Sequence, residues 1–127
     1  MKYYLDSCIV IYIVERITDY REQLIHLIPE DSELLVSDLT RMECRCKPIQ
    51  TKNTQLLEEF DFFFNESADT INLTTEVIDK ATEIRAAYSF KTPDSIHLAC
   101  SVIGKANFFV TNDKRLNAFT EVKVLCL

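Results

Sequence analysis

The sequence is poor in the residues that make flexible linkers, with one glycine and three prolines among 127 residues. It also lacks internal repeats and low-complexity segments. A chain of this length can bury an ordinary hydrophobic core without dividing into smaller units. We therefore expect residues 1–127 to form a single domain.

An excess of positive charge is also missing. The chain has 14 basic and 20 acidic residues, which gives a net charge of −6. Proteins that hold nucleic acid by bulk electrostatic attraction carry the opposite balance. Any contact with nucleic acid must therefore be local.

The cysteines form an odd set of five without a pair of Cys-x-x-Cys motifs, so neither a disulfide framework nor a zinc site is indicated. We interpret them as reduced, mostly buried thiols of a cytoplasmic protein. The longest apolar run, residues 8–14, is far shorter than the roughly 20 residues of a membrane span. Asp6 interrupts the only stretch that resembles a signal peptide, so we expect no membrane segment.

The first seven residues after the initial methionine read as a short buried strand that ends in a carboxylate. Tyr3, Tyr4 and Leu5 favour a strand, and Asp6 follows at once. Ligands of open α/β sheets bind beyond the carboxyl ends of the strands, where Asp6 would lie. The simpler alternative is that Asp6 only caps the next helix.

The rest of the chain alternates between helical and strand-like segments. Further strands are expected at residues 34–36, 70–73, 106–110 and 122–125. The expected helices span residues 8–14 and 19–28, begin at Ser37, follow Pro48, follow the Thr74 cap, begin at Thr92 and reach Phe119. The connections are long enough for parallel crossovers. This order predicts an α/β three-layer sandwich with a central, mainly parallel sheet of four to five strands flanked by helices.

Glu43 has the most informative spacing in the chain. On a helix that starts at Ser37, residues spaced i, i+3, i+4 and i+7 lie on one face. Here these residues are Leu39, Met42, Glu43 and Cys46. Burial of an ionised carboxylate costs several kcal/mol of folding free energy unless a cation or hydrogen-bond donors compensate its charge. Glu43 is therefore a ligand, or it pairs with a nearby base such as Arg41, Arg45 or Lys47, or it lies at the wet edge of the stripe.

Asp94 and His97 lie on one face of the helix expected from Thr92. Thr92 is expected as the cap, Pro93 as the first helical residue and Asp94 in the first turn. The helix is apolar nearly all round, which predicts a central position. Asp94 alone is explained by the helix dipole. A single histidine such as His97 is more often a structural hydrogen-bond donor than a ligand.

Asp113 repeats the logic of Asp6, because it follows an apolar strand and precedes a short helix that it would cap. If Asp6, Glu43, Asp94 and Asp113 meet at one end of the sheet, they repel one another unless a cation lies among them. Oxygen ligands favour Mg²⁺ or Mn²⁺. Such ions polarise phosphoryl oxygens and activate water, so the expected chemistry is phosphodiester hydrolysis.

The order and local setting of these acids resemble the PIN domain. The matching stretches are Leu5-Asp6-Ser7, Glu43 on a helix after the second strand, Thr92-Pro93-Asp94-Ser95-Ile96-His97-Leu98-Ala99, and Phe109-Val110-Thr111-Asn112-Asp113. The short single-domain form is similar to VapC-type toxins of bacterial toxin–antitoxin pairs. The resemblance spans essentially the whole chain, and it also favours a helix over residues 8–14.

The resemblance implies a hydrolase, namely a Mg²⁺- or Mn²⁺-dependent ribonuclease. The catalytic and metal-binding acids would be Asp6, Glu43, Asp94 and Asp113. Thr111 matches a hydroxyl residue that orients ligands, and Ser7 is a second supporting residue. The resemblance also implies a homodimer that a cognate antitoxin inhibits by entering the site. Asp38 is an additional acid, which we assign to the start of its helix.

An acidic chain that binds RNA needs local positive charge. Basic residues lie near the four acids in sequence, and we expect a phosphate-facing rim from Arg41, Arg45, Lys91, Lys114 and Arg115. The alternative is that each is an ordinary solvated charge. The acidic mouth of the site would also attract a basic antitoxin segment.

Other functions compete with a nuclease. A phosphoacceptor receiver domain expects paired acids at the end of the first strand, where this chain has Asp6 alone. A haloacid-dehalogenase-type phosphatase needs a second aspartate at the position of Cys8. A catalytically silent PIN-like binding module and a solitary nuclease without an antitoxin stay open.

Overall fold

The structure is a computed structural model that describes all of residues 1–127. Its centre is a sheet of five parallel strands in the order β3-β2-β1-β4-β5. The strands are β1 (Lys2–Leu5), β2 (Glu33–Ser37), β3 (Asp69–Ile71), β4 (Phe108–Thr111) and β5 (Lys123–Cys126). The α-helices are α1 (Ser7–Val14), α2 (Thr18–Leu27), α3 (Asp38–Gln50), α4 (Thr54–Phe62), α5 (Thr75–Tyr88) and α6 (Thr92–Ile103).

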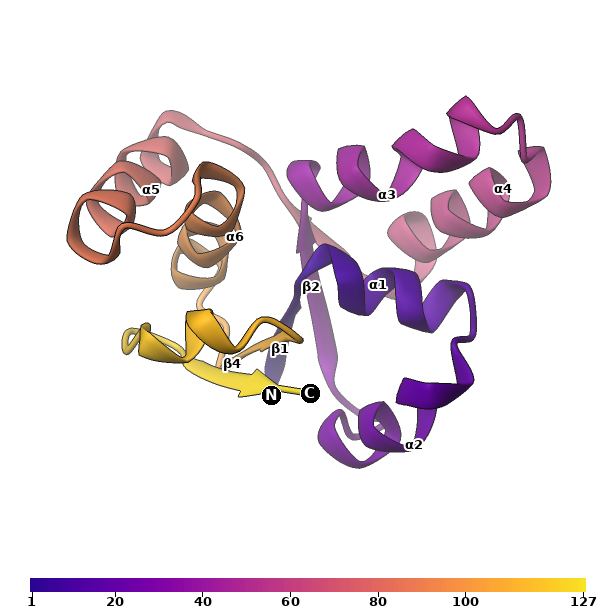
Figure 1. The fold of residues 1–127 in the computed structure, drawn as a ribbon, viewed down its shortest axis with the longest axis horizontal. Helices are drawn as coiled ribbons and strands as arrows, with labels where there is room; N and C mark the ends of the chain where they lie inside the picture. Colours follow the sequence, from indigo (N-terminus) through magenta and orange to yellow (C-terminus); the bar gives the residue numbers. More distant parts are fainter.

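Helices cover both faces of the sheet, which confirms the predicted three-layer α/β sandwich. Two shorter helical segments complete the chain, a π-helical turn at Phe63–Ser67 and a 3-10 helix at Lys114–Ala118. In Figure 1, α5 and α6 lie on one side of the strands, and α1, α2, α3 and α4 lie on the other. None of the helices combines the length and the apolar character that a membrane crossing requires.

The strand order decides where a ligand would bind. The chain runs outward from β1 to β2 and β3, then crosses to the other side of β1 to form β4 and β5. The order reverses beside β1, and a crevice opens at such a point beyond the carboxyl ends of the strands. The order also differs from the 2-1-3-4-5 order of receiver domains, which excludes that fold.

Each central strand sends alternate side chains into two separate cores, because successive residues of a strand point to opposite faces. Tyr4 and Phe109 pack with α5 and α6, while Leu5 and Val110 pack with the helices of the opposite face. All four side chains are buried. Residues 3–5 of β1 and 108–110 of β4 are therefore apolar at every position, as is typical of a parallel sheet covered on both faces.

The buried face of α3 shares Leu39 with the predicted stripe and otherwise differs from it. The other buried residues are Thr40, Cys44 and Pro48, whereas Met42 is 64% exposed. The cause lies at the start of the helix, where Ser37 and Thr40 form a capping box that turns Thr40 inward. The helix also continues through Pro48 to Gln50 rather than restarting after it.

Two other predicted boundaries shift for local reasons. Thr92 is the first residue of α6 and not its cap; the cap position is Lys91, whose carbonyl accepts a 3.0 Å hydrogen bond from Ser95 N. Strand β3 stops at Ile71, because the amide of Leu73 donates to Asp38 at 3.1 Å instead of to a strand. Asp38 is the first residue of α3, as predicted.

The cysteines are all free thiols, which agrees with the expected absence of a disulfide framework. Cys44 and Cys100 are fully buried, whereas Cys46 is exposed.

Candidate active site

Asp6 and Asp113 follow the carboxyl ends of β1 and β4, the two strands beside the point where the strand order reverses. Both acids also cap helices. Ser7 N donates to Asp6 Oδ1 at 2.8 Å, and Arg115 N donates to Asp113 Oδ1 at 3.0 Å. The capping alternative is therefore correct for both residues. It does not exclude a second role, since a carboxylate accepts several hydrogen bonds.

Thr111 ties the two acids together. Its hydroxyl is buried, donates to Asp6 Oδ2 at 2.8 Å and accepts from Asp113 N at 3.1 Å. The last residue of β4 thus sets the distance between the ends of neighbouring strands. With these two hydrogen bonds the Thr111 hydroxyl can orient the Asp6 carboxylate.

Asp94 lies in the first turn of α6, with its side chain 21% exposed. Burial raises the pKa of the Asp94 carboxyl, and the negative charges of Asp6 and Asp113 raise it further. Arg115 lies 4.0 Å from Asp94 and forms a bidentate pair with Asp113, which lowers the pKa of Asp113. Asp6, Asp94 and Asp113 are thus close enough to repel one another.

Glu43 lies at the wet edge of α3 and not in its buried stripe, since its side chain is 34% exposed. Its Oε1 accepts hydrogen bonds from Ser7 Oγ at 2.7 Å and from His97 Nε2 at 2.6 Å. The hydrogen bond from His97 lowers the pKa of Glu43 below its usual value.

The arginines considered as partners of Glu43 contact Asp61 instead. Arg45 donates to Asp61 at 2.8 Å, and Arg41 lies 3.8 Å from the same carboxylate. Of the alternatives for Glu43, a salt bridge to either of these arginines is therefore excluded. Of the expected phosphate contacts, Lys91 and Lys114 are exposed, and Lys91 lies close enough to Asp113 to lower its pKa.

Sequence reasoning missed the partners of His97. Its side chain is 2% exposed, and its Nδ1 lies 2.7 Å from the hydroxyl of Tyr4. That hydroxyl lies 2.8 Å from Ser37 Oγ. The apolar character of β1 suggested only packing for Tyr4, although a fully buried tyrosine hydroxyl requires a hydrogen-bond partner.

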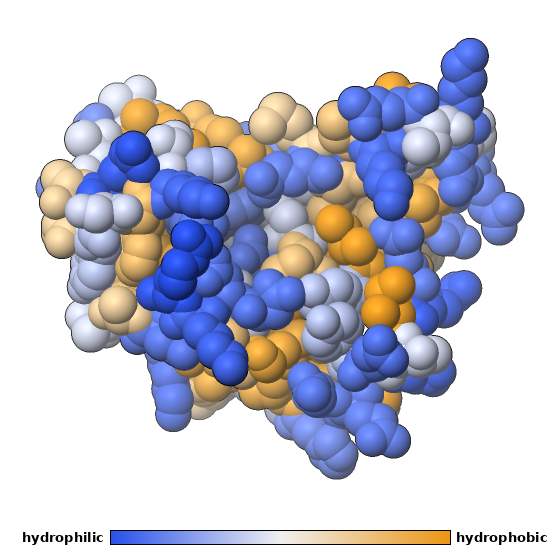
Figure 2. Space-filling view, in the orientation of Figure 1, coloured by the Kyte–Doolittle hydropathy of each residue, from blue (hydrophilic) through white to orange (hydrophobic).

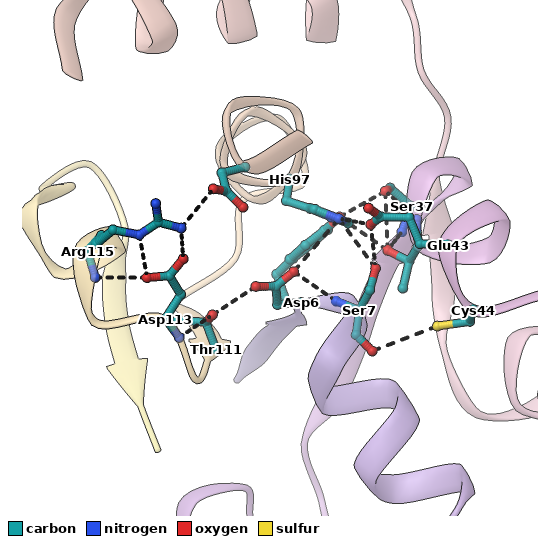
Figure 3. A network of polar contacts seen from close by, with 12 residues as sticks. Asp6, Ser7, Ser37, Glu43, Cys44, His97, Thr111, Asp113 and Arg115 are labelled. Carbon is teal, nitrogen blue, oxygen red and sulfur yellow. Dashed lines mark hydrogen bonds and ion pairs between the residues drawn. The ribbon is translucent and has the colours of Figure 1, made fainter. Parts of the chain in front are cut away.

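The contacts join the four acids into one series, which runs through Asp94, Arg115, Asp113, Thr111, Asp6, Ser7 and Glu43. In Figure 3, Asp6 lies between the Asp113–Arg115 pair on one side and the Glu43–His97 pair on the other. Figure 2 shows this face of the molecule hollowed between the α5–α6 side and the α3–α4 side.

The donor chemistry fits a hard divalent cation. The acids supply oxygen ligands only, and the mutual repulsion at Asp94 is what a cation relieves. In the present arrangement no three acidic, histidine or cysteine side chains form a group that could hold a metal ion. Arg115 and His97 engage Asp113 and Glu43. An ion held by Asp113 would compete with Arg115 for the same carboxylate.

Comparison with known protein families now identifies the fold. A family model, the PIN domain, matches residues 3–122. The chain belongs to the PIN domain family. The match covers Asp6, Glu43, Asp94 and Asp113, and so includes the whole contact series. A search of curated proteins finds no match.

Solved structures support the same fold. VapBC2 from Rickettsia felis, bound to a DNA fragment from its promoter, is 16% identical, with 99% of this chain and 98% of that chain aligned at a TM-score of 0.81. DNA-bound VapBC from Salmonella typhimurium is 14% identical, with coverage of 99% and 98% and a TM-score of 0.78. A toxin–antitoxin complex from Klebsiella pneumoniae is 18% identical, with coverage of 97% and 95% and a TM-score of 0.74.

Proposed function

We propose that this PIN domain is a divalent-metal-dependent endoribonuclease that hydrolyses RNA phosphodiester bonds. The observation that carries the proposal is that Thr111 joins Asp6 and Asp113, and that Asp94 lies close enough for their negative charges to raise its pKa. Clustered carboxylates in a sheet-end crevice are costly unless they serve a cation.

The residues have distinct roles in this proposal. Asp6, Glu43, Asp94 and Asp113 hold Mg²⁺ or Mn²⁺, and the ion when bound supplies charge stabilisation at the phosphoryl group and activation of water. Thr111 and Ser7 hold Asp6 and Glu43 in place through hydrogen bonds. Lys91 and Lys114 contact RNA phosphates, joined by Arg41, Arg45 and Arg115 where these leave their carboxylate partners.

We further propose that the protein is the toxin of a type II toxin–antitoxin system. It would act in the cytoplasm as a homodimer and bind a cognate antitoxin protein. The support is the likeness to VapBC complexes, which extends over nearly the full length of both chains. A short reading frame directly upstream of the gene would support this partner, and its absence would favour a solitary nuclease.

The test of the nuclease is RNA cleavage by the purified protein. We expect cleavage with Mg²⁺ or Mn²⁺, none with EDTA, and a loss of at least about 100-fold for Asp6→Asn and Asp94→Asn. Thermal unfolding should show that both variants remain folded. Cleavage that survives Asp94→Asn would remove the proposed mechanism.

One observation favours a second candidate, a silent PIN module that binds RNA or protein without cutting. Arg115 forms a bidentate pair with Asp113 and occupies the side of the site where an ion would lie. The two candidates differ in metal binding. If the protein is a nuclease, Mn²⁺ binding should raise its melting temperature by mass action. If it is a silent module in which Arg115 stays paired with Asp113, Mn²⁺ should leave the melting temperature unchanged.

A further inference from the structure

A buried hydrogen-bonded series connects the core of the protein to Glu43. It starts at the Tyr4 hydroxyl, passes through His97 and ends on Glu43 Oε1, with distances of 2.7 Å to Nδ1 and 2.6 Å from Nε2. Tyr4 is fully buried and His97 is 2% exposed. Only Glu43 reaches solvent.

The chemistry of the partners fixes where the hydrogen atoms lie. An ionised carboxylate only accepts, so Nε2 of His97 must carry a hydrogen and donate to Glu43. The Tyr4 hydroxyl, which donates to Ser37 Oγ at 2.8 Å, lies 2.7 Å from Nδ1 at the opposite end of the ring. The tyrosine thus fixes the orientation of the ring whose Nε2 holds Glu43.

Both hydrogen bonds to Glu43 end on the same oxygen. Ser7 Oγ and His97 Nε2 donate to Oε1, at 2.7 Å and 2.6 Å, which leaves Oε2 without a partner in the protein. His97 Nε2 also lies 3.8 Å from Asp6 Oδ1, so the ring lies between the carboxylates of Asp6 and Glu43. A carboxylate held by one oxygen presents the other in a defined direction.

We propose that His97 is a positioning residue, whose ring Tyr4 holds in the orientation that fixes Glu43 for ion binding. This inference rests on the proposed metal-dependent function. It assigns to a core histidine a role that packing alone does not require, because an apolar side chain would fill the same space.

Two amide variants separate the two ends of the ring. The amide nitrogen of glutamine can reach the place of Nε2, and the amide of asparagine can reach only the place of Nδ1. We expect His97→Gln to keep the wild-type Mn²⁺ dissociation constant within about threefold and His97→Asn to weaken it about 10- to 100-fold. Isothermal titration calorimetry without RNA measures both values, and kcat should fall more than KM rises in His97→Asn.

The outcomes distinguish this inference from the function on which it rests. Equal Mn²⁺ affinities for wild type, His97→Gln and His97→Asn would overturn the positioning role and leave the metal site intact. A wild-type protein that binds no Mn²⁺ would remove the proposed function itself. Thermal unfolding checks that both variants are folded.

Tyr4→Phe supplies a variant that preserves the core. It removes only the hydroxyl, and Ser37 and Thr40 still contact each other at 3.3 Å. Without that hydroxyl the ring loses the contact that orients it, so we expect Mn²⁺ binding to weaken about three- to tenfold. Unchanged Mn²⁺ affinity in folded Tyr4→Phe would overturn the part assigned to Tyr4, and it would decide the matter if the His97 variants fail to fold.

Discussion

At the scale of single residues, the structural roles of the acids are compatible with the chemical roles proposed for them. Asp6 caps α1 with one oxygen and accepts from Thr111 with the other. A carboxylate offers about four lone pairs, so these two bonds leave capacity for an ion. The capping hydrogen bond therefore orients the Asp6 carboxylate and leaves lone pairs available for an ion.

Asp94 shows the cost of such an arrangement. Its pKa is raised by burial and by two neighbouring acids, so the folded protein favours the protonated carboxyl more than the unfolded chain does. The resulting penalty is fully present at pH 7, and it disappears as the pH falls below the ordinary aspartate value. Without metal, Asp94 makes the fold less stable.

We therefore predict that Asp94→Asn raises the melting temperature of the metal-free protein at pH 7 by about 1–4 °C. The gain should shrink at pH 3.5, where the wild-type carboxyl is also neutral. Mn²⁺ should reverse the ranking, because it stabilises only the wild type. Asp79→Asn, at an exposed position of α5, is the control and should change little. A metal-free Asp94→Asn that melts below wild type would contradict the repulsion.

At the scale of elements, the sequence was most informative where chemistry interrupts a pattern. Asp6 and Asp113 each end an apolar run, and Thr74 precedes a regular helical stripe, so strand ends and helix starts could be predicted. The inward side of α3 could not, because Ser37 and Thr40 form a polar capping box that is nonetheless buried. The hydrophobic pattern identified Leu39 as buried, but it could not identify Thr40, whose side chain is polar.

The side-chain partners needed the tertiary structure. His97 meets Tyr4 and Glu43 across three elements, β1, α3 and α6, and no spacing in the sequence encodes that meeting. The pairing of Arg45 with Asp61 likewise joins two helices whose contact is set by packing. The four acids could be proposed from their local context, whereas their partners depend on how the layers stack.

Two helix caps allow a test at this scale. Thr74 caps α5 through a 3.2 Å bond from Val77 N, and Ser37 caps α3 while it also contacts Tyr4. Each change to alanine should lower the free energy of unfolding by about 1 kcal/mol or more, with the larger loss at buried Ser37. Only Ser37→Ala should also reduce RNA cleavage, since α5 supplies none of the proposed site residues. Urea unfolding and cleavage rates measured on the same preparations provide the comparison, and an activity loss in Thr74→Ala would contradict it.

At the scale of the whole molecule, the proposed cleavage of RNA has to be reconciled with a net charge of −6. Three of the five basic residues expected at the phosphates are engaged with carboxylates. Arg41 and Arg45 form ion pairs with Asp61, and Arg115 forms one with Asp113. Lys91 and Lys114 are exposed and have no carboxylate partner within ion-pair distance.

Two phosphate contacts predict a shallow salt dependence. For single-stranded RNA the logarithm of the binding constant should fall with the logarithm of salt concentration at a slope of about −1.4. Fluorescence anisotropy with Asp6→Asn, which should bind RNA without cutting it, measures the slope at constant Mg²⁺. Lys91→Gln should reduce its magnitude by about 0.7. Lys105→Gln, an exposed charge beyond the other end of α6, should leave it unchanged. A slope steeper than about −3 would mean that the arginines leave their carboxylates when RNA binds, and that the ion pairs are part of the RNA interface.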